Sequence, residues 1–153
     1  EREAQLASRV MLAEIRSMRP GGNGAYPIAA ASATSLSMHT DIDADGTIEL
    51  IRYFVDGTTL KKGVIRPVGS APVTYPTETE TVTEAVHYLT NPSVFAYYSE
   101  GDPDAIAPLT SPITIVNVRL VRVTLTTDLD ILSPPIPATV SIMATIRNLR
   151  GEI

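Results

Sequence analysis

The acidic segment at residues 41–49 is the part of the chain whose residue types could bind a metal ion. It reads Asp-Ile-Asp-Ala-Asp-Gly-Thr-Ile-Glu, which matches the first nine positions of an EF-hand calcium loop. Carboxylates at every second residue can surround a hard cation, and the glycine permits a sharp turn. This interpretation gives five candidate calcium ligands: Asp41, Asp43, Asp45, Thr47 and Glu49.

A second interpretation makes the same segment an acidic β-hairpin turn. An EF-hand loop needs a bidentate glutamate at its twelfth position, where this chain has Arg52. Aspartate side chains in turns also accept hydrogen bonds from nearby backbone N–H groups. We therefore expect a solvated turn that needs no ion for folding, with calcium as the alternative and no other cofactor.

The other reactive side chains form no catalytic or zinc-binding pattern. His39 and His87 are the only histidines, and neither lies in an H-x-x-H or H-E-x-x-H motif. A serine nucleophile needs a histidine and an acid in reach, and the chain has no G-x-S-x-G motif. The glycines at 21–24 lack the Lys-Ser/Thr ending of a phosphate loop and are expected to form a hinge. We expect no enzyme activity and no small-molecule substrate.

Composition narrows the class of protein further. The 153 residues are 44% hydrophobic and 19% charged, which is typical of a globular domain. The net charge of −5 argues against nucleic acid as a partner, because nucleic-acid binders carry a basic surface. Cysteine is absent, which excludes disulfides and thiolate metal sites. The sequence contains no run of 18 apolar residues that could span a bilayer, so we expect this part of the protein to be soluble.

Apolar spacing predicts a helix at the N-terminus. Ala7, Met11, Ile15 and Met18 recur at helical intervals, and Pro20 and the glycines after it end the pattern. The charged residues of this segment, among them Glu14, are expected to face solvent.

The rest of the chain alternates as β-strands do. Lys61-Lys62 is expected at an edge or on an exposed face, and a short helix is expected over Val82–Leu89. A change of alternation near Leu120 predicts either a bulge or a helical turn before that strand. The predicted strands are Thr34–Ile42, Thr47–Val55, Thr58–Arg66, Ser93–Ser99, Leu120–Thr127 and Ala138–Arg147.

These elements predict an α+β fold, with the N-terminal α-helix packed on an antiparallel β-sheet. The whole chain, 1–153, is expected to form one domain, in which residues 1–19 are helical and residues 33–153 make a β-rich head.

The order of these parts resembles the minor pilins and minor pseudopilins of type IV pili and type II secretion machines. The motifs that carry the resemblance are the helix Glu1–Met18, the acidic turn Asp41–Glu49 followed by Ile51-Arg52-Tyr53, the step from Leu89-Thr90-Asn91 to Phe95–Tyr98, the strand Val118–Leu125 and the closing Ile146-Arg147-Asn148-Leu149. The family's N-terminal processing site is absent, and Lys61-Lys62 stands where the family more often has arginine.

The resemblance implies a pilin-like fold and a structural role in the cell envelope or outside the cell. The partners would be other pilin or pseudopilin subunits, met through the outward face of the helix. We expect Met11, Leu12 and Ile15 to form that interface, because they add apolar surface beyond what one buried face requires. An apolar helix upstream of Glu1 would hold the subunit in the membrane before assembly. The alternative function is a secreted β-rich binding module, calcium-dependent or not, that recognises a surface or a glycan.

Overall fold

A computed structural model describes residues 2–42, 45–70, 72–99, 107–127 and 138–145. Within these ranges the chain forms one α-helix, two short 3-10 helices and eight strands. The helical elements are α1 (Arg2–Arg16), η1 (Thr77–Thr79) and η2 (Ile115–Asn117). The strands are β1 (Ile28–Ala31), β2 (Ser35–Thr40), β3 (Glu49–Asp56), β4 (Thr59–Ile65), β5 (Thr81–Val86), β6 (Phe95–Tyr98), β7 (Leu120–Thr127) and β8 (Ala138–Thr145).

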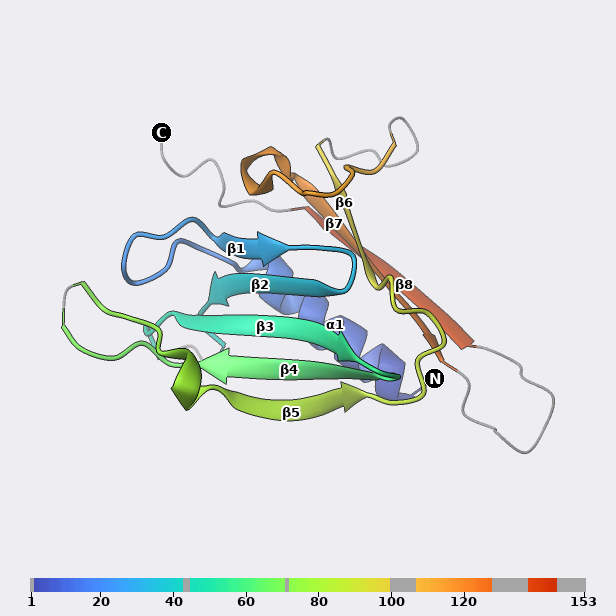
Figure 1. The fold of residues 1–153 in the computed structure, drawn as a ribbon, viewed down its shortest axis with the longest axis horizontal. Helices are drawn as coiled ribbons and strands as arrows, with labels where there is room; N and C mark the ends of the chain where they lie inside the picture. The colour runs from blue at the N-terminus through green and yellow to red at the C-terminus, as the bar shows by residue number, and fades with distance from the viewer. Residues whose placement is uncertain (1, 43–44, 71, 100–106, 128–137, 146–153) are drawn as a thin grey trace.

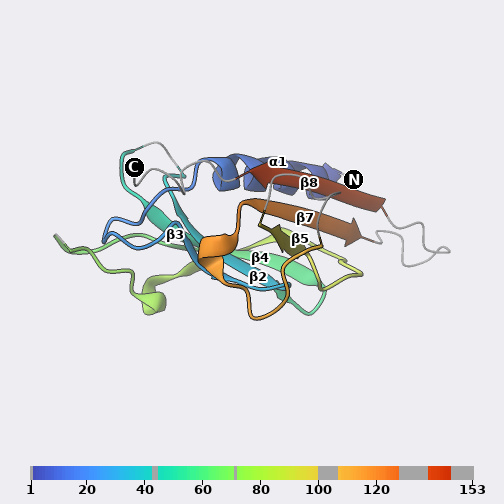
Figure 2. The same ribbon diagram turned by 90° about the horizontal axis from the view of Figure 1, so that it is seen from above.

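The strands form two antiparallel sheets. One contains five strands in the order β1-β2-β3-β4-β5, and the other contains three in the order β6-β7-β8 (Figure 1). Seen from above, α1 and β8 lie side by side on the same face of the five-stranded sheet (Figure 2). That face is called the inner face below, and the opposite one the outer face.

The predicted α+β, pilin-like fold class is wrong. The described chain is mostly antiparallel β-sheet with a single short helix. A helix of 15 residues covers only part of the face of five strands, so the rest of that face needs another apolar cover. The three-stranded sheet supplies it, with Phe95, Tyr97, Val121 and Val123 in the common core. The sequence patterns identified these strands but not their grouping into a second sheet.

The helix predicted over Val82–Leu89 is also wrong, because Thr81–Val86 is strand β5. Its β-branched residues favour a strand, and Val82 is exposed rather than on a buried helical face. The short strand β1 was not predicted. The six predicted strands are confirmed as β2, β3, β4, β6, β7 and β8, although Ile146 and Arg147 lie outside the described residues.

The expected irregularity before Leu120 is a short helical turn. Residues Ile115–Asn117 form η2, and β7 begins three residues later. Val118, Leu120 and Val121 are all buried, so the turn resets the alternation and keeps these three residues inside, while Val116 within the turn is exposed. Of the two sequence alternatives, the helical turn is therefore the one that the chain uses.

A glycine shapes the outer face of the five-stranded sheet. Gly63 lies opposite Arg52 in the β3–β4 pair, and a Cβ at this position would collide with the carboxylate of Glu80. The missing side chain lets Glu80 reach across β4. Its Oε1 accepts a 2.8 Å hydrogen bond from Arg52, whose guanidinium also lies 3.9 Å from the centre of the Phe54 ring.

Glu14 joins α1 to the inner face of the sheet. Its Oε1 accepts a 2.5 Å hydrogen bond from the hydroxyl of Tyr53, and its Oε2 lies 2.6 Å from the ammonium of Lys62. Burial and the nearby carboxylate raise the pKa of Tyr53, so the phenol stays protonated and donates. The expectations that Glu14 and Lys62 face solvent are wrong. Lys62 lies directly opposite the inward-facing Tyr53, and β4 lies between β3 and β5 rather than at an edge.

Replacing Glu14 with alanine should destabilise the chain markedly. The change leaves the buried Tyr53 hydroxyl and the mostly covered Lys62 ammonium without their partner. We expect a loss of about 2–3 kcal/mol in the free energy of unfolding, measured by urea denaturation. Glu78→Ala, on the exposed η1, is the control and should change it by less than about 0.5 kcal/mol. Equal stability of both variants would show that Glu14 does not hold the helix.

Candidate functional site

The acidic turn uses its carboxylates mainly to hold its own backbone. Asp41 accepts hydrogen bonds from the N–H groups of Asp45 at 3.2 Å and Gly46 at 2.8 Å. Asp45 accepts a 2.8 Å bond from the N–H of Thr47. Gly46 has a φ of +85°, a conformation that glycine adopts without strain. These local bonds are the kind that an ion-free turn would have.

Glu49 begins β3 and is fully buried. One oxygen accepts the N–H of Ile42 at 3.1 Å, and the other lies 3.0 Å from the guanidinium of Arg66. Arg66 therefore supplies positive charge where a bound cation would supply it. This pairing was not predicted, because it depends on where Arg66, the residue after β4, lies relative to the start of β3.

The structure brings together three of the five predicted metal ligands. Carboxylate oxygens of Asp41, Asp45 and Glu49 lie within 4.8 Å of one another, close enough to share a cation. Thr47 contributes its N–H to Asp45, and Asp43 lies outside the described residues. The cluster could hold a hard cation, but its oxygens already serve hydrogen bonds and an ion pair.

The predicted interface residues of α1 have different surroundings. Met11 and Ile15 are fully buried and face the chain's own core, so neither side chain is available on the outer surface of the helix. Leu12 is half-buried and packs against the same core. The helix is held to the sheets by these residues, and its exposed apolar surface comes from Leu6 and Val10, which are 54% and 48% exposed.

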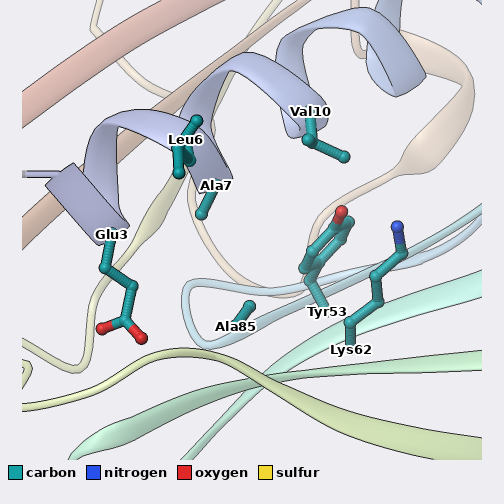
Figure 3. A pocket seen from close by; sticks show the side chains of 7 residues that line it. All are labelled: Glu3, Leu6, Ala7, Val10, Tyr53, Lys62 and Ala85. Carbon is teal, nitrogen blue, oxygen red and sulfur yellow. The ribbon is translucent and has the colours of Figure 1, made fainter.

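Leu6 and Val10 border an apolar groove between α1 and the sheet. Figure 3 shows them with Ala7 on the helix, across from Tyr53, Lys62 and Ala85 on the strands. Glu3 lines the same groove, which encloses about 270 Å³. Sequence periodicity missed this feature because Leu6 and Val10 also fit a broad core-facing stripe. Leu6 and Val10 lie one helical turn apart on the border of that stripe, and this position is the sequence signal that could have indicated the groove.

Each histidine has its own partners. The ring of His39 is buried, with Nδ1 3.0 Å from the carbonyl of Tyr26, and burial lowers its pKa. His87 follows β5, and its ring nitrogens lie 2.9 Å from Glu84 and 2.8 Å from Glu3 of α1. These two carboxylates raise the pKa of His87, and the hydrogen bond to Glu84 is the largest single cause. His87 thus fastens the start of the helix to the edge of the sheet.

Neither the protein-family models nor the curated proteins include a match to this chain. Among the described residues, no helix is long and apolar enough to cross a membrane. The family resemblance therefore rests on the sequence motifs alone.

Calcium should leave the melting temperature nearly unchanged. Because the turn is already closed by backbone hydrogen bonds, we expect equal melting curves in EDTA and in millimolar calcium. Asp45→Asn, which removes one carboxylate of the cluster, should respond no differently from the wild type. A rise of several degrees in calcium that disappears in Asp45→Asn would instead establish a cation site.

Stability should be greatest near pH 6.5, the ordinary pKa of histidine. The raised pKa of His87 stabilises the folded chain below 6.5, and this contribution is lost as pH rises through the folded-state pKa. The lowered pKa of His39 acts in the other direction. The folded chain favours the neutral ring of His39, so stability is lost as pH falls from 6.5 through the folded-state pKa of this residue.

Urea denaturation between pH 5 and pH 8 measures both effects. His87→Gln should remove the decline above pH 6.5 and leave the decline below it. His39→Gln should do the opposite, whatever its effect on overall stability. Unchanged profiles in both variants would exclude the histidines as the source of the pH dependence.

Proposed function

We propose that the chain is a structural subunit that assembles with neighbouring subunits through α1, as a minor subunit of a type IV pilus or a type II secretion pseudopilus. The observation that carries this proposal is the exposed pair Leu6 and Val10 beside the groove. The sequence resemblance supplies the kind of assembly, and the helix supplies a surface suited to it.

The two sides of α1 fit such a role. Met11 and Ile15 bury one side in the core, and Leu6 and Val10 leave apolar surface on another. Covering a side chain that is already half-buried gains on the order of 1 kcal/mol, since full burial gains about 1.5–3 kcal/mol. Two such residues make a weak contact. A subunit that meets several neighbours in a filament would add up many contacts of this size.

The charges on the helix are also divided between its sides. The acidic residues Glu3 and Glu14 bond to His87, Tyr53 and Lys62 of the chain itself. Arg9 and Arg16, seven residues apart on one face of α1, are exposed. A neighbouring subunit with acidic groups beside an apolar ridge would complement this face.

The proposal requires a membrane anchor before assembly. A bilayer demands about 20 apolar residues in a helix, so codons for such a segment should precede those for Glu1. A cleaved secretory signal with no retained apolar helix would rule out the pilin-type function. That finding would favour the alternative of a secreted binding module.

Leu6→Glu and Val10→Glu should impair assembly without unfolding the chain. Each puts a charge into a surface that the neighbour must cover, yet each replaced side chain is about half exposed in the isolated chain. Gln5→Glu adds the same charge at an exposed position without removing apolar surface and is the matched control. The measurements are thermal melting of the purified chain and filament or secretion function of the full-length protein in cells. Normal function of both groove variants would refute assembly through this flank.

A further inference from the structure

A cavity on the outer face of the five-stranded sheet is lined by a buried histidine. His39 lies opposite Leu50 in the β2–β3 pair, and both belong to this face because the neighbouring Ile51 is buried in the core. The segments before β1 and after β4 lie at the same end of the sheet and close the cavity there (Figure 1). It encloses about 470 Å³. This volume is within the range of roughly 300–1,000 Å³ that small-molecule sites have.

Tyr75 fixes one wall of this cavity, which is called the His39 cavity below. Its hydroxyl accepts a 2.9 Å hydrogen bond from the N–H of Gly22 and donates a 2.8 Å bond to the carbonyl of Ile48. Its ring lies 5.3 Å from that of His39, with the two planes at 60°. The two segments are therefore joined without a ligand, and a site that is already formed loses less free energy on binding.

The hydrogen bonds of His39 fix which ring nitrogen carries the proton. Nδ1 lies 3.0 Å from the carbonyl oxygen of Tyr26 and 3.2 Å from that of Pro27. Carbonyl oxygens only accept, so Nδ1 carries the hydrogen and Nε2 presents a lone pair. Burial lowers the pKa of His39, which keeps the ring in this neutral form.

Nε2 of His39 is an acceptor that the chain itself does not use. Among the described residues that are not exposed, Arg122 Nε is the one side-chain nitrogen or oxygen both sealed from solvent and without a hydrogen bond. Nε2 also lacks a partner within the described chain, so it cannot be sealed. Only 3% of His39 is exposed, and the residue lines the cavity, so the opening to Nε2 is the cavity. A Cβ on Gly21 would lie 3.0 Å from Nε2, and the glycine keeps this ring edge free of a side chain.

The lining defines the chemistry of a ligand. None of the ten described residues that line the cavity is charged once His39 is neutral, so no side chain there would pair with an ionic group. Tyr26 and Tyr75 offer half-buried rings, and the hydroxyls of Tyr26 and Thr74 make no hydrogen bond within the described chain. A matching molecule is neutral, has an apolar face for the rings and carries hydroxyls around its rim.

We propose that the His39 cavity binds a neutral pyranose sugar, one hydroxyl of which donates a hydrogen bond to Nε2 of His39. The C–H groups of a pyranose carry partial positive charge and suit the negative face of a tyrosine ring. The site lies on the opposite side of the sheet from α1. It therefore goes beyond the proposed assembly function, is compatible with it and does not depend on it.

Two histidines in the chain make NMR of ¹³C-labelled histidine a direct test. The probes are the methyl glycosides of glucose, galactose, mannose and N-acetylglucosamine, titrated at constant pH. At least one should shift the ring signals of His39 saturably, with a Kd in the millimolar range expected for so small a ligand. His87, outside the cavity, is the internal control and should not shift. The charged sugars glucosamine and glucuronate should bind more weakly than their neutral counterparts.

Two variants on β1 separate filling of the cavity from general damage to the chain. Ala29 is exposed and lines the cavity, so Ala29→Leu should occupy the space of the sugar and abolish saturation transfer to its protons. Ala30→Leu makes the same change at the next residue, which is exposed and outside the lining, and should leave binding unchanged. Both variants should melt close to the wild type.

His39→Asn tests the hydrogen bond itself. The asparagine amide can place an N–H where Nδ1 stood and has no atom at the position of Nε2, so binding should weaken about tenfold. Binding of wild-type strength in a folded His39→Asn would overturn the role of Nε2. If that variant does not fold, the comparison of Ala29→Leu with Ala30→Leu still decides whether the sugar occupies the cavity.

Three results would overturn the proposal as a whole. They are the absence of a His39 shift with every neutral glycoside, equal sugar binding by Ala29→Leu and the wild type, and tighter binding of a charged sugar than of its neutral counterpart. Because these measurements use the purified chain, their failure is distinct from a failure of Leu6→Glu to impair assembly in cells.

Discussion

The packing of α1 on the inner face of the five-stranded sheet is the constraint on which the rest of the structure depends. Met11, Ile15 and Met18 enter the core, and Glu14 fixes the position of the helix through Tyr53 and Lys62. Once the helix lies there, the space left on that face determines where the three-stranded sheet can pack. The same placement leaves the side chains of Leu6 and Val10 uncovered on the flank of α1 that borders the groove.

Local sequence signals specified much of the fold. The alternation over Thr47–Val55 and Thr58–Arg66 predicted two strands, and the structure pairs them as the β3–β4 hairpin. It was harder to predict which face of the sheet each side chain occupies. Lys62 points inward because its partner across the ladder is Tyr53, and that pairing depends on register rather than composition. Strand β5 was missed because Val82 and Val86 fit a helical spacing as well as a strand.

The candidate sites show the same limit. Carboxylate spacing correctly drew attention to Asp41, Asp45 and Glu49, which do converge. It could not show that Arg66, seventeen residues away, would pair with Glu49. The periodicity of the apolar residues likewise identified one apolar face of α1, but it did not show which of these residues enter the core and which stay exposed. Met11 and Ile15 belong to the core, and only the position of the sheet edge shows that Leu6 and Val10 do not.

The absent side chain at Gly63 has a consequence for how the molecule opens. Glu80, the residue just before β5, reaches Arg52 on β3 by passing over β4. The outermost strand is therefore tied at one end to a strand two positions inward and at the other, through His87, to α1. Terminal strands of sheets commonly detach first in local unfolding. These two ties resist such fraying, so the outer border of the sheet keeps its shape while it remains open to solvent.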